Sequence, residues 1–183
     1  MSRIPIPANV DTAPAGSRPL LEGVLKQLGV VPNMFRLIAN SPVALEGSLA
    51  LSAALGKGAL APATRERIAL AVSEIHRCSY CLAAHTYVGR NLTKLDDAEI
   101  GANRAGSSND AVAAAAVRFA ATVTKERGHV SEDDIRALKA AGYDDAQLIE
   151  VVLHVALNTF TNYLNVIAQT ELDFPAVSPL RPG

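Results

Sequence analysis

The sequence has few aromatic residues, few cysteines and no cluster of positive charge. Aromatic side chains make up 4% of the 183 residues, with no tryptophan, whereas hydrophobic residues make up 49%. A core of alanine, leucine, valine and isoleucine favours packed helices over a strand sandwich, which relies more on β-branched and aromatic residues. The formal net charge is -1, and no basic stripe of the kind that binds nucleic acids is present.

Long apolar runs are also missing. No segment approaches the roughly 18 uninterrupted apolar residues of a membrane span, and the N-terminal stretch MSRIPIPANVDTAPAGSRPL lacks the apolar centre of a signal peptide. We therefore expect a cytoplasmic protein that binds neither membranes nor nucleic acids. In that reducing compartment, a lone cysteine pair is more typical of redox or metal chemistry than of a permanent cross-link.

Helical patterns run through most of the chain, and no stretch alternates apolar and polar residues for long enough to predict a strand. We expect an extended N-terminal arm over residues 1–19, a single all-α domain, a helical bundle, over 20–172, and an irregular C-terminal tail over 173–183. The patterns predict helices over 19–29, 31–42, 42–58, 61–75, 78–91, 95–106, 108–128, 131–142 and 144–173.

Both cysteines lie in the short stretch RCSYCLAAH, residues 77–85. Cys78, Cys81 and His85 are three and four positions apart, which places their side chains on one face of a helix. The polar stretch HRCS separates two apolar-periodic segments. We therefore predict a turn near residue 77, with both cysteines in the first turn of the second helix.

This placement favours redox chemistry. The unpaired N–H groups and the positive dipole end of a helix N-terminus stabilise a thiolate. A thiolate attacks peroxides and disulfides, and a second thiol nearby can convert the resulting sulfenic acid into a disulfide. His85, one turn further on, can take up or return the proton.

Two other interpretations of the cysteines stay open. Cys78 and Cys81 can be small core residues, with His85 a buried, hydrogen-bonded histidine. A zinc site is the second, with His76, His129 or a carboxylate as the fourth ligand. No second CxxC or HxxxH is present to complete a familiar zinc site.

The segment ERIALAVSEIHRCSYCLAAHTYVGR resembles the core of the AhpD-like alkylhydroperoxidases within the carboxymuconolactone decarboxylase superfamily. Their pattern is a glutamate, about eleven residues, CxxC, three residues and a histidine, which here reads Glu66, Cys78, Cys81 and His85. NMFRLIANSP and the asparagine-rich last helix are also similar to the peroxidase-related branch. The resemblance covers roughly residues 20–172.

The resemblance implies a thiol-dependent peroxidase that reduces hydrogen peroxide or organic hydroperoxides. Cys81 would be the peroxidatic cysteine, Cys78 the resolving cysteine, and His85 with Glu66 a proton relay. No metal or cofactor is implied beyond an external thiol reductant, expected to be a dithiol protein. The resemblance also implies a homo-oligomer, a trimer or a hexamer.

Two details of the site stay open. On one straight helix, Glu66 would lie roughly 22 Å from Cys81, so it reaches the site only if the chain bends back; Glu74 is the local alternative. Best-studied relatives carry a histidine just before the second cysteine, where this chain has Tyr80, which is not a base near neutral pH.

The last predicted helix carries a polar stripe on an otherwise apolar sequence. His154, Asn158, Asn162 and Asn165 recur every three or four residues. We expect them to form a buried, mutually hydrogen-bonded seam at a helix or subunit interface; the alternative is that they line the active-site cavity.

Two other functions remain as alternatives. The first is a decarboxylase like the superfamily's namesake, which does not depend on a CxxC pair. The second is a non-catalytic metal-binding or structural helical module.

Overall fold

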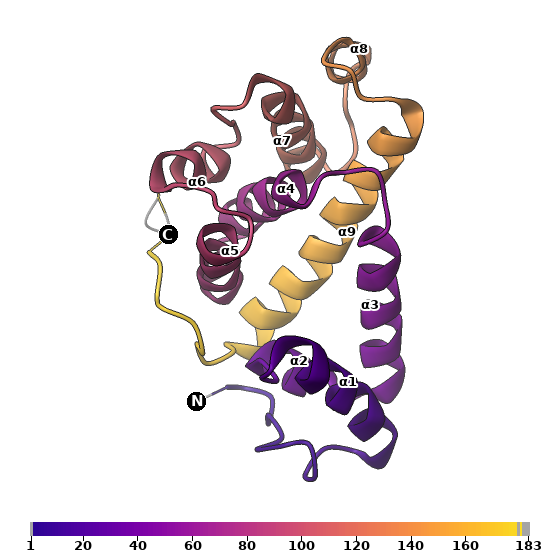
Figure 1. The fold of residues 1–183 in the computed structure, drawn as a ribbon, viewed down its shortest axis with the longest axis vertical. Helices are drawn as coiled ribbons and strands as arrows, with labels where there is room; N and C mark the ends of the chain where they lie inside the picture. Colours follow the sequence, from indigo (N-terminus) through magenta and orange to yellow (C-terminus); the bar gives the residue numbers. More distant parts are fainter. Residues whose placement is uncertain (1, 179, 181–183) are drawn as a thin grey trace.

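A computed structural model describes residues 2–178 and 180 of the chain. Within those residues it contains nine α-helices, one short 3-10 helix and no strand, which confirms the predicted all-α fold (Figure 1). The elements are η1 (Ala15–Ser17), α1 (Arg18–Leu28), α2 (Asn33–Ile38), α3 (Pro42–Leu55), α4 (Pro62–Ile75), α5 (Ser79–Asn91), α6 (Asp97–Arg104), α7 (Ala111–Lys125), α8 (Glu132–Ala140) and α9 (Asp145–Ala168).

Local sequence sets many of the helix ends. Gly29 closes α1 in the left-handed conformation, with φ 75°, which glycine adopts without steric strain. Ser131 caps α8 by accepting from the backbone of Asp134, whose side chain accepts in return from the Ser131 backbone. Such helix ends can be predicted from the sequence because they need particular residues at fixed positions relative to the helix.

Helix α4 is the central helix of the bundle. Every residue from Ile68 to Ser73 is buried, and α4 packs against α5, α6, α7 and α9. Because four helices cover it, α4 carries a wide apolar face rather than a narrow stripe. The main core lies between α4, α7, α8 and α9.

Helix α9 runs diagonally through the molecule from near α8 to near α2 (Figure 1). It is the one helix of the described residues that is long and apolar enough to span a membrane. It packs against α3, α4, α5 and α7, and core helices of soluble proteins pass the same test. This packing buries 44% of the most apolar stretch of α9.

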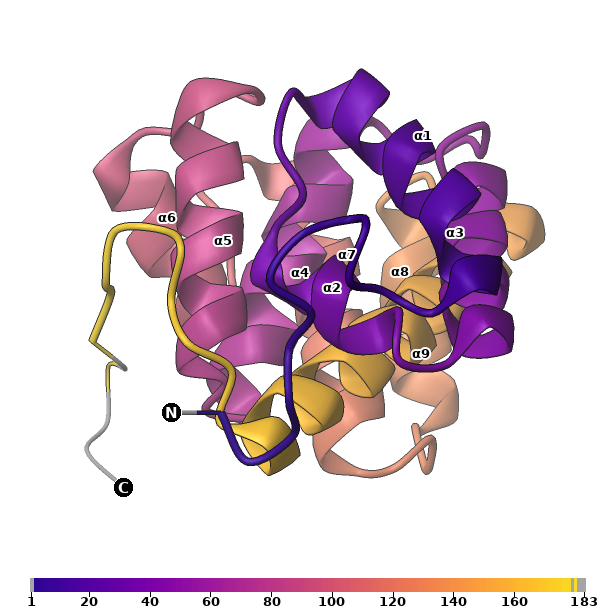
Figure 2. The same cartoon turned by 90° about the horizontal axis from the view of Figure 1, so that it is seen from below.

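Helix α9 ends earlier than the sequence predicts. The pattern suggested helix to residue 173, but Gln169 adopts the left-handed conformation, with φ 51°, and ends α9 at Ala168. Residues 170–178 then run as an irregular segment alongside α5 and towards α6, as both Figure 1 and Figure 2 show.

The N-terminal residues fold back onto the bundle. The backbone N–H of Arg3 donates to the carbonyl of Ala168 at 2.6 Å, and Asn40 donates from Nδ2 to the carbonyl of Pro5 at 2.8 Å. This segment is irregular up to Pro14 and is followed by η1. The domain boundaries at residues 19 and 172 remain a prediction.

Candidate functional site

The turn between α4 and α5 positions the cysteines. Arg77 has a φ of 53°. Around it, the N–H of Arg77 donates to the carbonyl of Glu74, and that of Cys78 to Ser73. This is the bond pattern of a Schellman helix end, so the chain reverses within three residues. The predicted break near residue 77 is confirmed.

Cys78 and Cys81 form a disulfide at the start of α5. Cys78 is the residue that caps the helix, and its Sγ accepts from the backbone N–H of Cys81 at 3.3 Å. Their side chains are almost covered, with exposed fractions of 1% and 3%. Both cysteines therefore lie in the first turn, as predicted, where backbone donors point at sulfur.

The reversal brings Glu66 to the site. Helix α5 folds back along α4, and His85 Nδ1 lies 2.9 Å from Glu66 Oε2. Since a carboxylate only accepts, Nδ1 carries the proton of this bond, which leaves Nε2 as the nitrogen for proton exchange.

Glu74, the local alternative, faces elsewhere. Its Oε2 accepts from Arg104 Nε at 2.9 Å, and its Oε1 accepts from the backbone N–H of Leu180 at 2.7 Å. Both carboxylate oxygens are thus engaged in tying α4 to α6 and to the C-terminal segment. Glu66, and not Glu74, pairs with the site histidine.

A mainly apolar cavity of about 260 Å³ opens beside the disulfide. Of the two cysteines, Cys81 lines it and Cys78 does not. Glu66 and His85 line the same cavity, so an acid–base pair and a sulfur lie together in it. The apolar lining comes chiefly from Leu28, Met34, Phe35, Ile38, Val88 and Phe174.

Tyr80 closes the rim of this cavity rather than acting as a base. Its hydroxyl accepts from the backbone N–H of Met34 at 3.1 Å, and its ring packs edge-on against Phe174. Burial raises the pKa of Tyr80 far above its ordinary value, and the neighbouring Asp173 carboxylate adds to the shift. Tyr80 stays protonated and joins α2, α5 and the C-terminal segment.

The polar stripe of α9 differs from the expected seam. All four side chains are buried, but His154 Nε2, Asn162 Oδ1 and Asn165 Oδ1 have no hydrogen-bond partner among residues 2–178 and 180. Asn158 lines the cavity, and Asn165 donates from Nδ2 to Cys81 Sγ at 3.5 Å. The expectation of a mutually satisfied seam is therefore wrong, because part of the stripe faces the site.

The remaining histidines lie away from the sulfurs. His76 Nε2 lies 3.2 Å from Thr159 Oγ1, and its ring meets Tyr163 edge-on; burial lowers the pKa of His76. His129 is exposed in the loop before α8. Within the described part of the chain, no three His, Cys, Asp or Glu side chains are placed to hold a metal ion.

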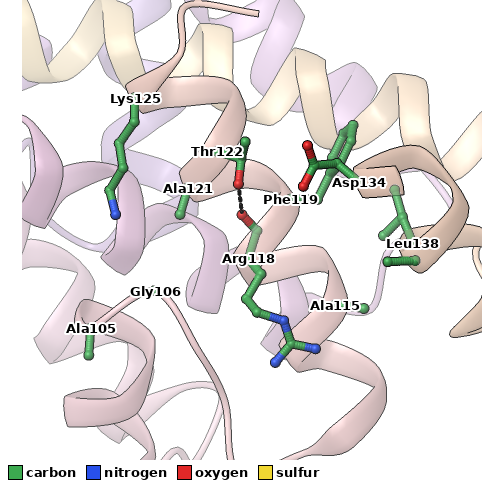
Figure 3. Close-up of a pocket in the computed structure, with 11 residues that line it drawn as sticks. Ala105, Gly106, Ala115, Arg118, Phe119, Ala121, Thr122, Lys125, Asp134 and Leu138 are labelled. Atoms are coloured by element: carbon green, nitrogen blue, oxygen red, sulfur yellow. Dashed lines mark hydrogen bonds between the residues drawn. The ribbon is translucent and has the colours of Figure 1, made fainter. Parts of the chain in front are cut away.

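A second cavity of about 260 Å³ lies between α6, α7 and α8 (Figure 3). Arg118 and Lys125 reach over it, and Thr122 Oγ1 donates to the carbonyl of Arg118. Among the described residues that line it there is no cysteine or histidine. Of these two cavities, the first is thus the one lined by a cysteine and a histidine.

The helical bundle thus carries a disulfide at the start of α5 with a His–Glu pair beside it. Residues 42–126 match the carboxymuconolactone decarboxylase (CMD) family. This match and the solved structures below agree with the resemblance seen in the sequence. Residues 42–126 are therefore a carboxymuconolactone decarboxylase family segment, and the fold of the described residues is AhpD-like.

Two similar structures are of peroxidase-related proteins. The alkylhydroperoxidase AhpD core from Ralstonia eutropha JMP134, an uncharacterized peroxidase-related protein, is 27% identical, with a TM-score of 0.83 over 94% of this chain and 92% of that one. An uncharacterized peroxidase-related protein from Silicibacter sp. TM1040 is 25% identical, with a TM-score of 0.78 over 91% of each chain.

The fold is also that of a debrominase. Apo Bmp8 is 19% identical, with a TM-score of 0.76 over 92% of this chain and 91% of that one. No curated protein matches the chain. Proteins that share this fold thus include peroxidase-related proteins and a debrominase.

Proposed function

We propose that this protein is a cofactor-free thiol peroxidase that cycles between a Cys78–Cys81 dithiol and disulfide. The observation that carries the proposal is the shared cavity: Cys81 lines it together with the hydrogen-bonded pair His85 and Glu66. A nucleophile, a proton carrier and space for a small substrate therefore meet at one place.

Cys81 begins the cycle as a thiolate, its proton taken by His85 Nε2. The sulfur attacks one peroxide oxygen, so that an S–O bond forms and the O–O bond breaks with its electron pair on the leaving oxygen. His85 returns the proton to that oxygen, releasing an alcohol or water. Glu66 holds Nδ1 and stabilises the charged ring while it carries the proton.

Cys78 completes the oxidative half. Its sulfur attacks the Cys81 sulfenic acid, the S–S bond forms, and hydroxide leaves as water after protonation. The two Cα atoms are 5.3 Å apart, within the usual range for a disulfide. An external dithiol, proposed to be a protein of the cytoplasm, then reduces the disulfide by exchange.

The lining of the cavity bears on the substrate. Its apolar side chains suit the organic part of a small hydroperoxide better than hydrogen peroxide alone. We therefore expect organic hydroperoxides to have the lower KM, with hydrogen peroxide also reduced.

Reductive dehalogenation is the second candidate. A cysteine-to-alanine variant of the debrominase Bmp8 in complex with 2,3,4-tribromopyrrole shares the fold, with 17% identity and a TM-score of 0.76. An apolar cavity beside a thiol favours this chemistry too. The test is bromide release from 2,3,4-tribromopyrrole by the reduced protein. If protein that still turns over hydroperoxide releases no bromide, this candidate is excluded.

The test of the proposal is hydroperoxide consumption by the reduced protein with a dithiol reductant. Wild type is expected to turn over, Cys81→Ser to be inactive, and Cys78→Ser to stop after one turnover without a small thiol to resolve it. Turnover that survives Cys81→Ser would overturn the proposal.

A further inference from the structure

The two sulfurs have different hydrogen-bond donors. The backbone N–H at the start of α5, which belongs to Cys81, points at Cys78 Sγ at 3.3 Å. Of the hydrogen bonds in the described part of the chain, the one that reaches Cys81 Sγ comes from Asn165 Nδ2, at 3.5 Å. A backbone N–H at the start of α5 thus donates to Cys78 Sγ, and a side chain of α9 donates to Cys81 Sγ.

The Asn165 amide is held in this orientation. Its Nδ2 also donates to the carbonyl of Thr161 at 2.9 Å, so one N–H is fixed by α9 and the second faces the sulfur. A flipped amide would set Oδ1 against that carbonyl, two acceptors in contact. The orientation is therefore determined by the helix itself.

Burial makes this contact matter. Asn165 is 3% exposed, and within the described part of the chain its Oδ1 has no hydrogen-bond partner. A buried amide with one unsatisfied atom is destabilising, whereas an apolar side chain of similar size would fit a helix interface without that penalty. Such a residue at a reacting sulfur is better explained by the chemistry than by packing.

We propose that Asn165 is a catalytic residue whose amide N–H stabilises the Cys81 thiolate. This inference rests on the proposed function, in which Cys81 is the attacking sulfur. A hydrogen bond to the charged form lowers the free energy of the thiolate relative to the thiol. Asn165 thereby helps decide which cysteine ionises in the cavity.

The same contact acts in the reductive half of the cycle. An incoming thiolate forms an S–S bond with Cys78, and the Cys78–Cys81 bond breaks with its electron pair on Cys81 Sγ. Asn165 stabilises that leaving thiolate before His85 protonates it. A better-stabilised leaving thiolate leaves faster, so Asn165 assists both halves.

The experiment measures the ionisation of Cys81 without any peroxide. In a Cys78→Ser background, where Cys81 is the sole thiol, the rate of iodoacetamide alkylation is followed by mass spectrometry across pH. Asn165→Leu removes the donor at similar volume, and Asn165→Ala removes it together with the rest of the amide. The matched control is Asn162→Leu, on the same helix, where the amide donates to Ser73 Oγ at 3.4 Å and not to sulfur.

Both Asn165 variants are expected to raise the alkylation midpoint by about one pH unit, the size of one hydrogen bond to a charged group. The Asn162 variant is expected to leave the midpoint unchanged, and circular dichroism identifies any variant that fails to fold. An unchanged midpoint in whichever Asn165 variant folds would overturn the inference. Since alkylation needs no peroxide, this failure is distinct from a lack of peroxidase activity.

Discussion

Glu66 and Glu74 occupy the same helix but have different partners. Glu66 accepts from the histidine of the cavity, whereas Glu74 forms an ion pair with Arg104. Their positions in the sequence favour neither, because the choice depends on how α5 returns along α4. The family pattern selected Glu66, and the hydrogen bond to His85 agrees with that choice.

Removal of the Glu66 carboxylate tests its place in the relay. Glu66→Gln is expected to lower kcat for hydroperoxide by roughly 100-fold, at the lower end of general acid–base contributions, because His85 loses the charge that stabilises its protonated ring. Steady-state kinetics at several pH values measures the effect.

Glu74→Gln is the matched control for that experiment. It is expected to lower the melting temperature by loss of the largely buried pair with Arg104, while kcat stays at the wild-type value. Equal losses of kcat in the two variants would show that Glu66 acts through stability alone.

Asn165 is a residue whose role the sequence could not assign. Its three- and four-residue spacing from Asn162 and Thr161 predicts a shared helix face but not what that face meets. Only the packing of α9 across the start of α5 brings its amide to Cys81. By contrast, Cys78, Cys81 and His85 are local in sequence, so their common face could be predicted from spacing.

At the scale of single elements, α6 depends on one buried carboxylate. Burial alone raises the pKa of Glu99, but hydrogen bonds from Ser108, Asn103, the Asn109 backbone and Arg67 outweigh it and hold the pKa at about 2. Glu99 therefore joins α6 to α4 and to the loop before α7.

This carboxylate should make stability fall in acid. A depressed folded-state pKa gives stability that is present above the ordinary value of 4.5 and is lost as pH falls towards about 2. Glu99→Gln is expected to lower the free energy of unfolding at pH 7 by on the order of 3 kcal/mol and to flatten its pH dependence in that window.

Urea unfolding between pH 2 and pH 7 measures the effect. Asp97→Asn, on the same helix in an exposed pair with Arg90, is expected to change stability by less than about 0.5 kcal/mol. A pH dependence that is the same in Glu99→Gln and wild type would refute the assignment.

The C-terminal end of α9 could not be predicted from the hydrophobic pattern of the sequence. The sequence TELD continues the polar–apolar pattern of α9, yet Gln169 turns left-handed and ends the helix. Asp173 then accepts from the Asn33 backbone at 2.6 Å, and Phe174 becomes part of the cavity wall. These contacts join distant parts of the chain, so they cannot be predicted from the local sequence.

At the scale of the whole molecule, one face of α9 is exposed in the described part of the chain. Its apolar residues recur at helical spacing on the exposed side, with exposed fractions of 64% at Ile149, 42% at Phe160 and 60% at Ile167. A continuous apolar stripe of this kind is typical of an interface between subunits. We propose that this face joins copies of the chain in a trimer or hexamer.

Charge on this face should dissociate the assembly. Phe160→Glu combined with Ile167→Glu is expected to give monomers in sedimentation velocity, where wild type sediments as an oligomer. Val43→Glu, at an apolar residue of α3 that is 77% exposed, serves as the control and should leave the assembly intact. A monomeric wild type would contradict the proposal.

The bundle itself follows from sequence features that repeat along the chain. Proline at the start of α3 and α4, glycine after α1 and side-chain caps before α8 and α9 mark the ends of helices. The apolar width of α4 then indicates a central helix. Which helices meet, and hence the shape of the cavity, depends on contacts across the whole molecule.

The decisive measurement is the oxidation of fully reduced wild type by one equivalent of cumene hydroperoxide, read by intact mass and thiol titration. If Cys81 and Cys78 form the proposed redox pair, the protein loses both thiols and two hydrogen atoms, with a Cys78–Cys81 disulfide in the peptide map. If both thiols survive excess hydroperoxide in folded protein, the chain is not a thiol peroxidase.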